Sequence, residues 1–298
     1  MGKKGGVRPF WKEVINSKPF SGGANLWERE GFIQSQGLRL RYLEKGQGKA
    51  VVLLHGFGDC ARVWEFVLPY LGDRGRFIAL DQRGHGLSDR ADLQSYSTFD
   101  FVQDLHALLE TLGLDEVCLV GHSMGGRNAI VYAALHPQRV KKLVVIDYGP
   151  ELSAKGRRRI VRALRERGDV FRLEDMAKAL IEENPRLTLQ KAFLYLEKVT
   201  RPLGDGLHSW LCDNRLFEQM RKGKRVLRDI DLKEFLSRVK VPILLIRGKE
   251  SDLLDEEGVD AFLKSAPNTE LREIHGAGHA VPVDNPEELA RVLLEFIG

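Results

Sequence analysis

The sequence has few cysteines and no long apolar run. Its three cysteines, Cys60, Cys118 and Cys212, are widely separated, cannot all pair and form no Cys-x-x-Cys motif. Such spacing favours reduced thiols in a cytoplasmic protein over a disulfide framework. No segment approaches the roughly 18 uncharged apolar residues that a membrane-spanning helix needs. The first ten residues are basic but lack the apolar core of a secretory signal, so we expect no stable membrane insertion.

The remaining composition is that of an ordinary globular chain. Its 298 residues are 43% hydrophobic and 30% charged, enough for one large α/β domain or for a core domain with an inserted subdomain. The net charge of +4 is uneven, because residues 151–235 contain 20 Lys and Arg against 14 Asp and Glu. The densest basic runs, 155–167 and 221–228, have helical spacing and are interleaved with acids. This pattern favours solvated helix faces over a nucleic-acid surface, and we expect no nucleic-acid partner.

Short apolar runs alternate with helical patterns along most of the chain. These runs are residues 51–54, 77–80, 117–120, 143–146 and 243–246. Their length and their Gly or charged borders are typical of strands buried on both faces of a parallel sheet. Residues 98–113 and 286–298 have helical patterns, and the alternation on either side of Gln36-Gly37 predicts a hairpin. The predicted fold is an α/β fold with a mostly parallel central sheet flanked by helices.

The alternation of strands and helices is interrupted once, between residues 151 and 235. This stretch is helical in pattern, charged and dotted with aromatic residues, and it shows no clear buried strand. We predict an all-helical cap over the carboxyl ends of the strands, where ligands bind in open α/β sheets. The expected organisation is a basic extension at 1–26, a core domain at 27–150 and 236–298, and a helical cap at 151–235.

Polar clusters directly follow the apolar runs, at the point where each predicted strand ends. They are HGFGD (55–59), DQRGHGLSD (81–89), GHSMGG (121–126) and RGKESD (247–252), with HGAGHAV (275–281) after a further short alternating segment. Because parallel strands end at the same edge of a sheet, we expect residues more than 200 positions apart to converge there.

Within these clusters lie the parts that serine hydrolysis needs. Ser123, between two glycines, is the expected nucleophile, His279 the general base and Asp252 the carboxylate that orients it. Asp147, which follows the run 143–146, is an alternative acid. The backbone N–H groups of Phe57 and Met124 would bind the developing oxyanion.

Taken together, these motifs resemble the α/β-hydrolase fold superfamily, and more narrowly its capped carboxylesterase, lactonase and C–C hydrolase branch. The resemblance covers residues 27–150 and 236–298, and the order Ser, Asp, His is the one expected of that fold. It implies hydrolysis through an acyl-enzyme, which needs no metal and no cofactor. The cap matches only in its position and helical character.

Other polar and aromatic residues near these motifs have structural interpretations. We expect His122 to pack under the nucleophile turn and His55 to brace the loop before Phe57. His275, the alternative base, would end a strand. The 81–88 run is interpreted as a structural turn. Candidates for lining the substrate pocket are Trp64, Tyr148, His208 and Trp210.

The predicted function is hydrolysis of a small or medium carboxylic ester by a monomer or homodimer. A lactonase would use the same residues, and so would a C–C hydrolase, although relatives of that kind often carry Trp where this chain has Ala280. The alternative from another class is a ligand-binding receptor with negligible turnover. The intact set of catalytic residue types favours an enzyme.

Overall fold

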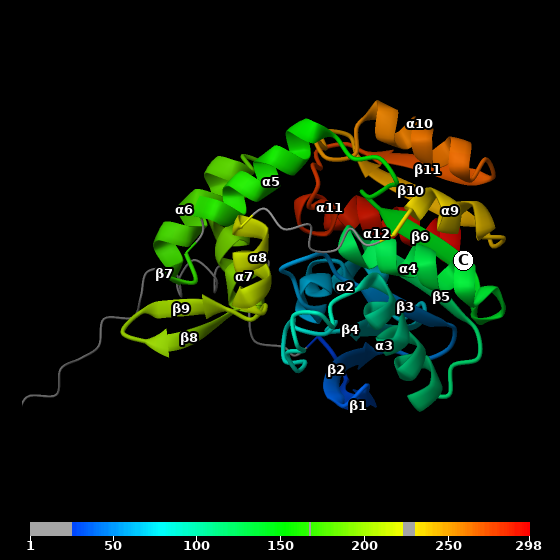
Figure 1. The fold of residues 1–298 in the computed structure, drawn as a ribbon, viewed down its shortest axis with the longest axis horizontal. Helices are drawn as coiled ribbons and strands as arrows, with labels where there is room; N and C mark the ends of the chain where they lie inside the picture. Colours follow the sequence, from blue (N-terminus) through cyan, green and yellow to red (C-terminus); the bar gives the residue numbers. More distant parts are fainter. Residues whose placement is uncertain (1–25, 167, 223–229) are drawn as a thin grey trace, which may run out of the picture.

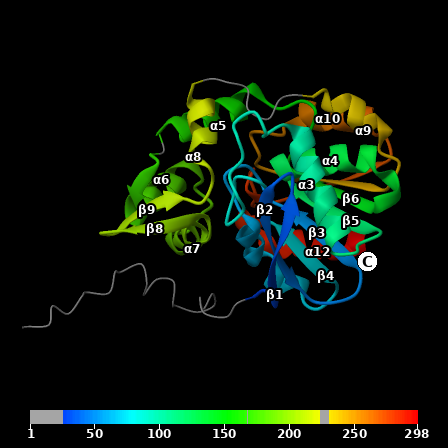
Figure 2. The same cartoon turned by 60° about the horizontal axis from the view of Figure 1, so that its bottom comes forward.

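The central element of the protein is an eight-stranded sheet, seen in a computed structural model that describes residues 26–166, 168–222 and 230–298 (Figures 1 and 2). Its order is β1-β2-β4-β3-β5-β6-β10-β11. The strands are β1 (Arg29–Ser35), β2 (Leu38–Lys45), β3 (Ala50–Leu54), β4 (Arg76–Leu80), β5 (Val117–His122), β6 (Val140–Ile146), β10 (Ile243–Gly248) and β11 (Thr269–Ile274). β2 is antiparallel to both of its neighbours, and the other adjacent pairs are parallel. The predicted mostly parallel α/β fold is therefore confirmed.

The hairpin predicted at the start of the chain joins β1 to β2. Gln36 and Gly37 both have positive φ, 48° and 78°, as a two-residue turn between twisted strands requires. The five apolar runs of the sequence all lie in strands, because each is buried along nearly its whole length.

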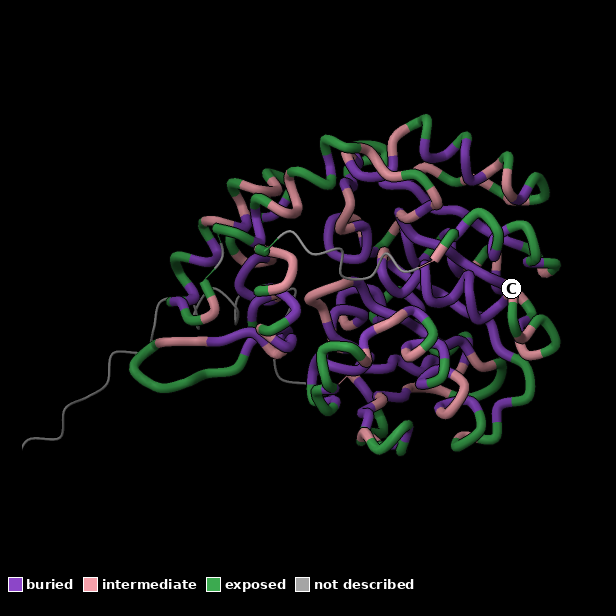
Figure 3. Tube along the Cα trace, in the orientation of Figure 1, coloured by how far each residue is buried: buried purple, intermediate pink, exposed green. Residues whose placement is uncertain are grey.

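Two hydrophobic cores cover the two faces of this sheet, since successive strand residues point to opposite sides. One core packs η1 (Ala61–Phe66), α2 (Leu68–Leu71), α11 (Val281–Asp284) and α12 (Pro286–Ile297) against residues such as Leu53 and Val120. The other packs α3 (Thr98–Thr111), α4 (Met124–Leu135), α9 (Leu232–Arg238) and α10 (Glu256–Ser265) against their neighbours Leu54 and Leu119. The inner strands β3, β4, β5, β6 and β10 are accordingly buried between the helices, whereas the edge strands β1 and β11 are only partly buried (Figure 3).

Between β6 and β10 the chain forms a separate group of elements beside the core, which we call the cap (Figure 1). Its elements are α5 (Ala154–Glu166), β7 (Val170–Arg172), α6 (Leu173–Glu183), α7 (Leu189–Val199), β8 (Thr200–Gly204), β9 (Leu207–Trp210) and α8 (Asn214–Arg221). The prediction of an all-helical cap is wrong, because β7, β9 and β8 pair in an antiparallel sheet. These strands have only three to five residues, too few to give a clear alternating pattern.

Most of the first basic run of the cap is exposed to solvent, apart from Arg159, which is partly buried beside the cavity described below. Arg157, Arg158, Arg162 and Arg165 are exposed along α5, as the solvated-face interpretation predicts. Residues 223–228 of the second basic run lie outside the described residues, as do residues 1–25 of the N-terminal extension. In the described part of the chain, no helix combines the length and the apolar character needed to cross a bilayer.

The segment that follows β4 is held by buried charges. The Arg83 guanidinium donates two hydrogen bonds to Asp104, at 2.6 and 2.7 Å, and both side chains are 1% exposed. Asp81 accepts from the Arg41 guanidinium at 2.7 Å and from the Ala61 amide at 2.6 Å. These bonds fix the loop between β4 and α3, as the structural interpretation of this run requires.

Removing the buried partner of Arg83 should destabilise the fold strongly. The Asp104→Ala variant would leave the buried Arg83 guanidinium with only the more distant Asp100 carboxylate, at 3.5 Å, and loss of a buried ion-pair partner typically costs about 3–5 kcal/mol. We expect urea denaturation to show that loss in the free energy of unfolding. Glu116→Ala, which breaks a half-exposed pair with Lys141 at 3.7 Å, is the control and should cost less than about 1 kcal/mol. Equal losses in the two variants would contradict this account.

Candidate active site

Ser123 stands at a sharp turn between β5 and α4. Its φ is 50° and its ψ is −115°, a conformation that non-glycine residues rarely adopt. A side chain at Gly121 would collide with the backbone of Gly125, and one at Gly125 would collide with the Leu54 carbonyl. The two glycines therefore let the helix start against the ends of β3 and β5, with the serine hydroxyl raised at the turn.

The Ser123 hydroxyl lies in a hydrogen-bonded row with a histidine and an aspartate. Its Oγ is 3.1 Å from His279 Nε2, and His279 Nδ1 donates to Asp147 Oδ2 at 2.7 Å. His279 follows β11 in a loop, and Asp147 directly follows β6, the neighbour of β5 in the sheet. Asp147 is completely buried, whereas the serine and the histidine are partly exposed. This is the geometry of a nucleophile, a base and an orienting carboxylate.

The structure reverses the preference between the two candidate acids. Asp252 makes no hydrogen bond with the His279 ring; its carboxylate accepts two hydrogen bonds from Arg159 of α5, at 2.7 and 2.8 Å. Three residues separate Asp252 from the end of β10, and this loop runs outward to the cap. Its Ser251 points the other way and donates to Asp147 at 2.6 Å. The Gly248 amide also donates to Asp147, at 3.1 Å.

The loop between β3 and η1 carries Phe57, the predicted first oxyanion donor. His55 Nδ1 donates to the Gly56 carbonyl at 2.8 Å, and its Nε2 accepts from the Gln82 amide at 3.1 Å. The Gln82 side chain in turn donates to the His55 carbonyl and accepts from Asn128 at 2.7 Å. His55 thus braces the loop as the sequence predicts, and Gln82 and Asn128 extend the support to α4.

The second predicted donor, the backbone amide of Met124, lies in the first turn of α4, where amides have no partner within the helix. Phe57 lines the cavity above Ser123. Its ring packs edge-on against Phe217 of α8, with centroids 5.5 Å apart. The cap therefore contacts the loop that carries one of the two amides.

A cavity of about 440 Å³ lies over Ser123, between the core and the cap. Its apolar lining comes mainly from the cap, for example Ile160 and Leu180, and from the segment after His279, for example Pro282. Charged groups of both signs also line it: Asp59, Arg159, Glu183, Arg186, Glu250 and Asp252. Tyr195 of α7 reaches it as well and donates to Asp59 at 2.7 Å. Arg159 and Tyr195 lie far along the chain from the motifs and had no signal in the sequence, whereas Asp59 ends the cluster HGFGD but was not expected to line the pocket.

The four aromatic and histidine candidates for the pocket do not line this cavity. Trp64 is fully buried in the core, and Tyr148 packs against the core on the other face of the sheet. His208 lies near Thr200 within the small cap sheet, and Trp210 donates to the Gly168 carbonyl at 3.0 Å. Large aromatic residues near a site are more often part of a core than of a pocket, and this is so for both tryptophans.

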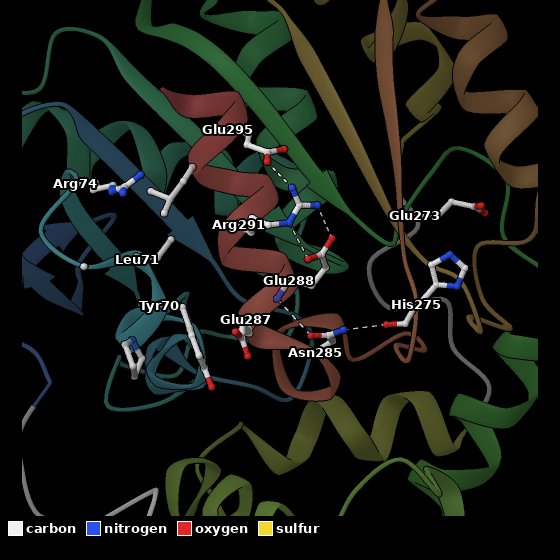
Figure 4. Close-up of a pocket in the computed structure, with 13 residues that line it drawn as sticks. Tyr70, Leu71, Arg74, Glu273, His275, Asn285, Glu287, Glu288, Arg291 and Glu295 are labelled. Atoms are coloured by element: carbon white, nitrogen blue, oxygen red, sulfur yellow. Dashed lines mark hydrogen bonds and ion pairs between the residues drawn. The ribbon is translucent and has the colours of Figure 1, made fainter.

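A second hollow, of about 940 Å³, lies beside α12 and is larger than the cavity over Ser123 (Figure 4). Arg291, Glu288 and their neighbours line it, and the two are paired at 2.6 Å. His275, the alternative base, follows β11 and lines this hollow; its carbonyl accepts from Asn285 at 2.9 Å. Neither Ser123 nor His279 lines it, so the smaller cavity is the candidate active site.

A parallel sheet with a serine turn after β5 and a histidine loop after β11 defines the serine hydrolases of the α/β type. The family model for the alpha/beta hydrolase fold matches residues 49–156. A putative 2-succinyl-6-hydroxy-2,4-cyclohexadiene-1-carboxylate synthase of Bacillus subtilis is 30% identical over 88% of this chain and 96% of its own length. The chain belongs to the α/β-hydrolase family.

Two further comparisons find proteins of one other name. A 2-(acetamidomethylene)succinate hydrolase of Mesorhizobium japonicum is 28% identical over 87% of this chain and 92% of its own length. The crystal structure of an E-2-(acetamidomethylene)succinate hydrolase superposes with a TM-score of 0.81 at 27% identity. It covers 90% of this chain and 98% of the other. The likeness extends through the cap as well as the core.

Replacing each candidate acid should separate their roles at Ser123. Asp147→Asn would disfavour the His279 tautomer that accepts the serine proton, a change that lowers kcat by about 10⁴ in a serine protease. We expect covalent labelling of Ser123 by a fluorophosphonate to slow by several orders of magnitude in this variant. In Asp252→Asn the labelling rate should stay within about tenfold of wild type. Slow labelling in Asp252→Asn alone would restore the original assignment.

Buried histidines near the site should make the fold sensitive to acid. Burial lowers the pKa of His85 to about 3, that of His122 to about 3 and that of His55 to about 4. In the unfolded chain these rings regain their ordinary pKa of 6.5 and bind protons that the folded protein excludes. Their contribution to stability is therefore complete above about pH 6.5 and is lost as the pH falls toward 3–4.

The effect should be visible in the pH dependence of unfolding. Each such histidine contributes about 1.4 kcal/mol per pH unit to the slope below about pH 6. His85→Phe should reduce the slope of unfolding free energy between pH 4.5 and 6 by about that amount. An unchanged slope in His85→Phe would show that this ring does not titrate on unfolding.

Proposed function

We propose that this protein is a serine esterase that cleaves small or medium carboxylic esters through an acyl-enzyme. The observation that carries the proposal is the row from Ser123 Oγ through His279 to Asp147, with spacings of 3.1 and 2.7 Å. This row opens into the cavity between core and cap. Membership of the α/β-hydrolase family supports hydrolysis, and the choice of an ester is our own inference.

In the first half of the reaction, Ser123 Oγ attacks the ester carbonyl while His279 Nε2 takes its proton. Asp147 holds the ring and stabilises the imidazolium that forms, with the Ser251 hydroxyl and the Gly248 amide holding its carboxylate in turn. The amides of Phe57 and Met124 bind the oxyanion of the tetrahedral intermediate. One such donor typically contributes about 3–4 kcal/mol to transition-state stabilisation. His279 then gives the proton to the alkoxide, which leaves as the alcohol.

In the second half, water attacks the acyl-serine. His279 removes a proton from that water, the same amides bind the second oxyanion, and the acid leaves as the serine regains its proton. A lactone would be opened by the same steps, with the alcohol remaining attached to the acyl group. A cavity of about 440 Å³ with a mainly apolar cap lining suits acyl groups of small to medium size.

A burst assay tests this proposal directly. Short p-nitrophenyl esters should give a burst of p-nitrophenolate followed by steady turnover, because acylation precedes hydrolysis of the acyl-enzyme. Ser123→Ala should lose the burst and reduce kcat by about 10⁶, as removal of the nucleophile does in a related triad. Mass spectrometry of the quenched burst should find the acyl group on Ser123.

Two outcomes would count against the esterase. No turnover by a correctly folded wild-type protein would favour a C–C hydrolase or a ligand-binding receptor. Turnover that survives in Ser123→Ala would remove Ser123 from the reaction altogether. Circular dichroism and the melting temperature of both proteins provide the check on folding.

A further inference from the structure

Asp284 is a buried carboxylate close to the base, and the mechanism above does not use it. It ends α11, the short helix that starts two residues after His279, and it is 8% exposed. Among the described residues its carboxylate accepts from two neutral donors and from no cation. The nearby Lys191 ammonium donates instead to the main-chain carbonyls of residues 283 and 284. Burial raises the pKa of the Asp284 carboxyl group, so its charge is held there at a cost in free energy.

The two hydrogen bonds of Asp284 join the loop of the base to the cap. We call residues 275–280, between β11 and α11, the base loop. Asp284 Oδ2 accepts from the Gly278 amide at 2.8 Å, and Gly278 directly precedes His279. Asp284 Oδ1 accepts from the Asn184 side chain at 2.7 Å, and Asn184 follows α6 of the cap as its C-terminal cap residue. Both groups that face Asp284 are donors, so an ionised carboxylate, which only accepts, fits this position.

The side-chain amide of Asn184 is fixed in one orientation. Its oxygen accepts from the Arg186 guanidinium at 3.0 Å, so its nitrogen faces Asp284. The same guanidinium lies against the base loop, because a Cβ atom at Gly278 would be 3.0 Å from Arg186 Nη1. Two consecutive contacts of the cap, one through Asn184 and one through Arg186, therefore meet the backbone just before the base.

His279 needs such support because it lies in a loop and not in a helix or a strand. Its ring has to keep Nε2 at 3.1 Å from Ser123 Oγ while Nδ1 stays 2.7 Å from Asp147. On one side, the His279 carbonyl accepts from His122 Nε2 at 2.8 Å. On the other side, the preceding backbone amide donates to Asp284. Such support matters for the rate, since misplacing a reacting group by about 1 Å can cost about 10²-fold.

We propose that Asp284 is a positioning residue for His279 and that Asn184 of the cap holds Asp284 in this role. The inference rests on the proposed hydrolysis at Ser123 and deepens it: the cap takes part in aligning the base as well as in enclosing the substrate. Asp284 does not line the cavity over Ser123, so it acts through the base loop and not through contact with the substrate. Its loss should therefore lower kcat and leave KM nearly unchanged.

Asp284→Asn tests this role with the smallest change of shape. The new side-chain amide has to point its –NH₂ group at the Gly278 amide or at the Asn184 amide, and both of these are donors. We expect kcat for short p-nitrophenyl esters to fall about tenfold or more, with KM within about threefold of wild type. Fluorophosphonate labelling of Ser123 should slow by a similar factor, because it depends on the same base.

Exchanging the two residues should restore the rate. In Asn184→Asp/Asp284→Asn, the amide at position 284 accepts from Gly278 and donates to the carboxylate at position 184, so each donor again faces an acceptor. The carboxylate at position 184 still accepts from the Arg186 guanidinium. We expect kcat to return to within about threefold of wild type. The deciding quantity is kcat and not KM, because position 184 lines the cavity.

Glu65→Gln is the matched control, because it removes another carboxylate that ties the core to the cap. Glu65 of η1 accepts from the Lys198 ammonium of α7 at 2.6 Å and from Arg62, and neither partner belongs to the base loop. Its kcat and its labelling rate should stay within about twofold of wild type. Equal losses of kcat in Glu65→Gln and Asp284→Asn would assign the effect to a loosened cap and overturn the proposal.

Two further results would also overturn it. One is a lower melting temperature of Asp284→Asn with unchanged kcat and labelling rate, which would make the role of Asp284 purely structural. The other is a loss of kcat that the exchanged variant does not restore, which would show that the contact with Asn184 does not hold the base loop. Circular dichroism of each variant checks that it is folded.

Failure of the esterase gives a different pattern. If wild type hydrolyses no ester but Ser123 is labelled, the esterase is wrong, and the labelling rates of the same variants decide the role of Asp284. If Ser123 of folded wild type is not labelled either, His279 does not activate it, and both proposals are wrong. If wild type hydrolyses the esters and Asp284→Asn does so equally well, the esterase stands and the positioning role is wrong.

Discussion

The site depends on two strained residues at the ends of neighbouring strands. Ser123 after β5 and Asp147 after β6 have nearly the same positive φ, 50° and 51°. Each such conformation costs about 1–3 kcal/mol and persists only when its surroundings impose it. Here the sheet does so: the Ser123 amide bonds to the Ile146 carbonyl at 2.9 Å, and the Asp147 amide to the Ile246 carbonyl at 2.7 Å. The proposed nucleophile and its proposed carboxylate are thus positioned in the same way, by backbone hydrogen bonds at the ends of adjacent strands.

Much of this architecture could be predicted from the sequence, because it depends on local patterns. Buried parallel strands give continuous apolar runs. Glycines are required on either side of Ser123 because neighbouring backbone lies too close for a side chain to fit there. The polar residues that end each run converge because of strand direction alone. The expectation that Ser123 and His279 meet needed no more than this.

What could not be predicted depends on contacts between distant segments. Whether Asp147 or Asp252 faces His279 is decided by the direction of the loop after β10, which the Arg159 pair sets from the other side of the cavity. The sheet of the cap is held together by pairing of short strands that have little pattern of their own. Trp64 and Trp210 are buried in cores for a similar reason, since periodicity does not say which apolar surface an aromatic ring meets.

In the loop after β10, the consecutive residues Ser251 and Asp252 face in opposite directions. Ser251 bonds inward to the carboxylate of Asp147, and Asp252 pairs outward with Arg159 of α5. One peptide unit therefore links the cap to the hydrogen bonds that hold the acid. Any shift of α5 would therefore act on the Ser251 hydrogen bond to Asp147 through this one peptide unit. Substitutions in the cap that alter the Arg159–Asp252 pair would then change kcat as well as KM.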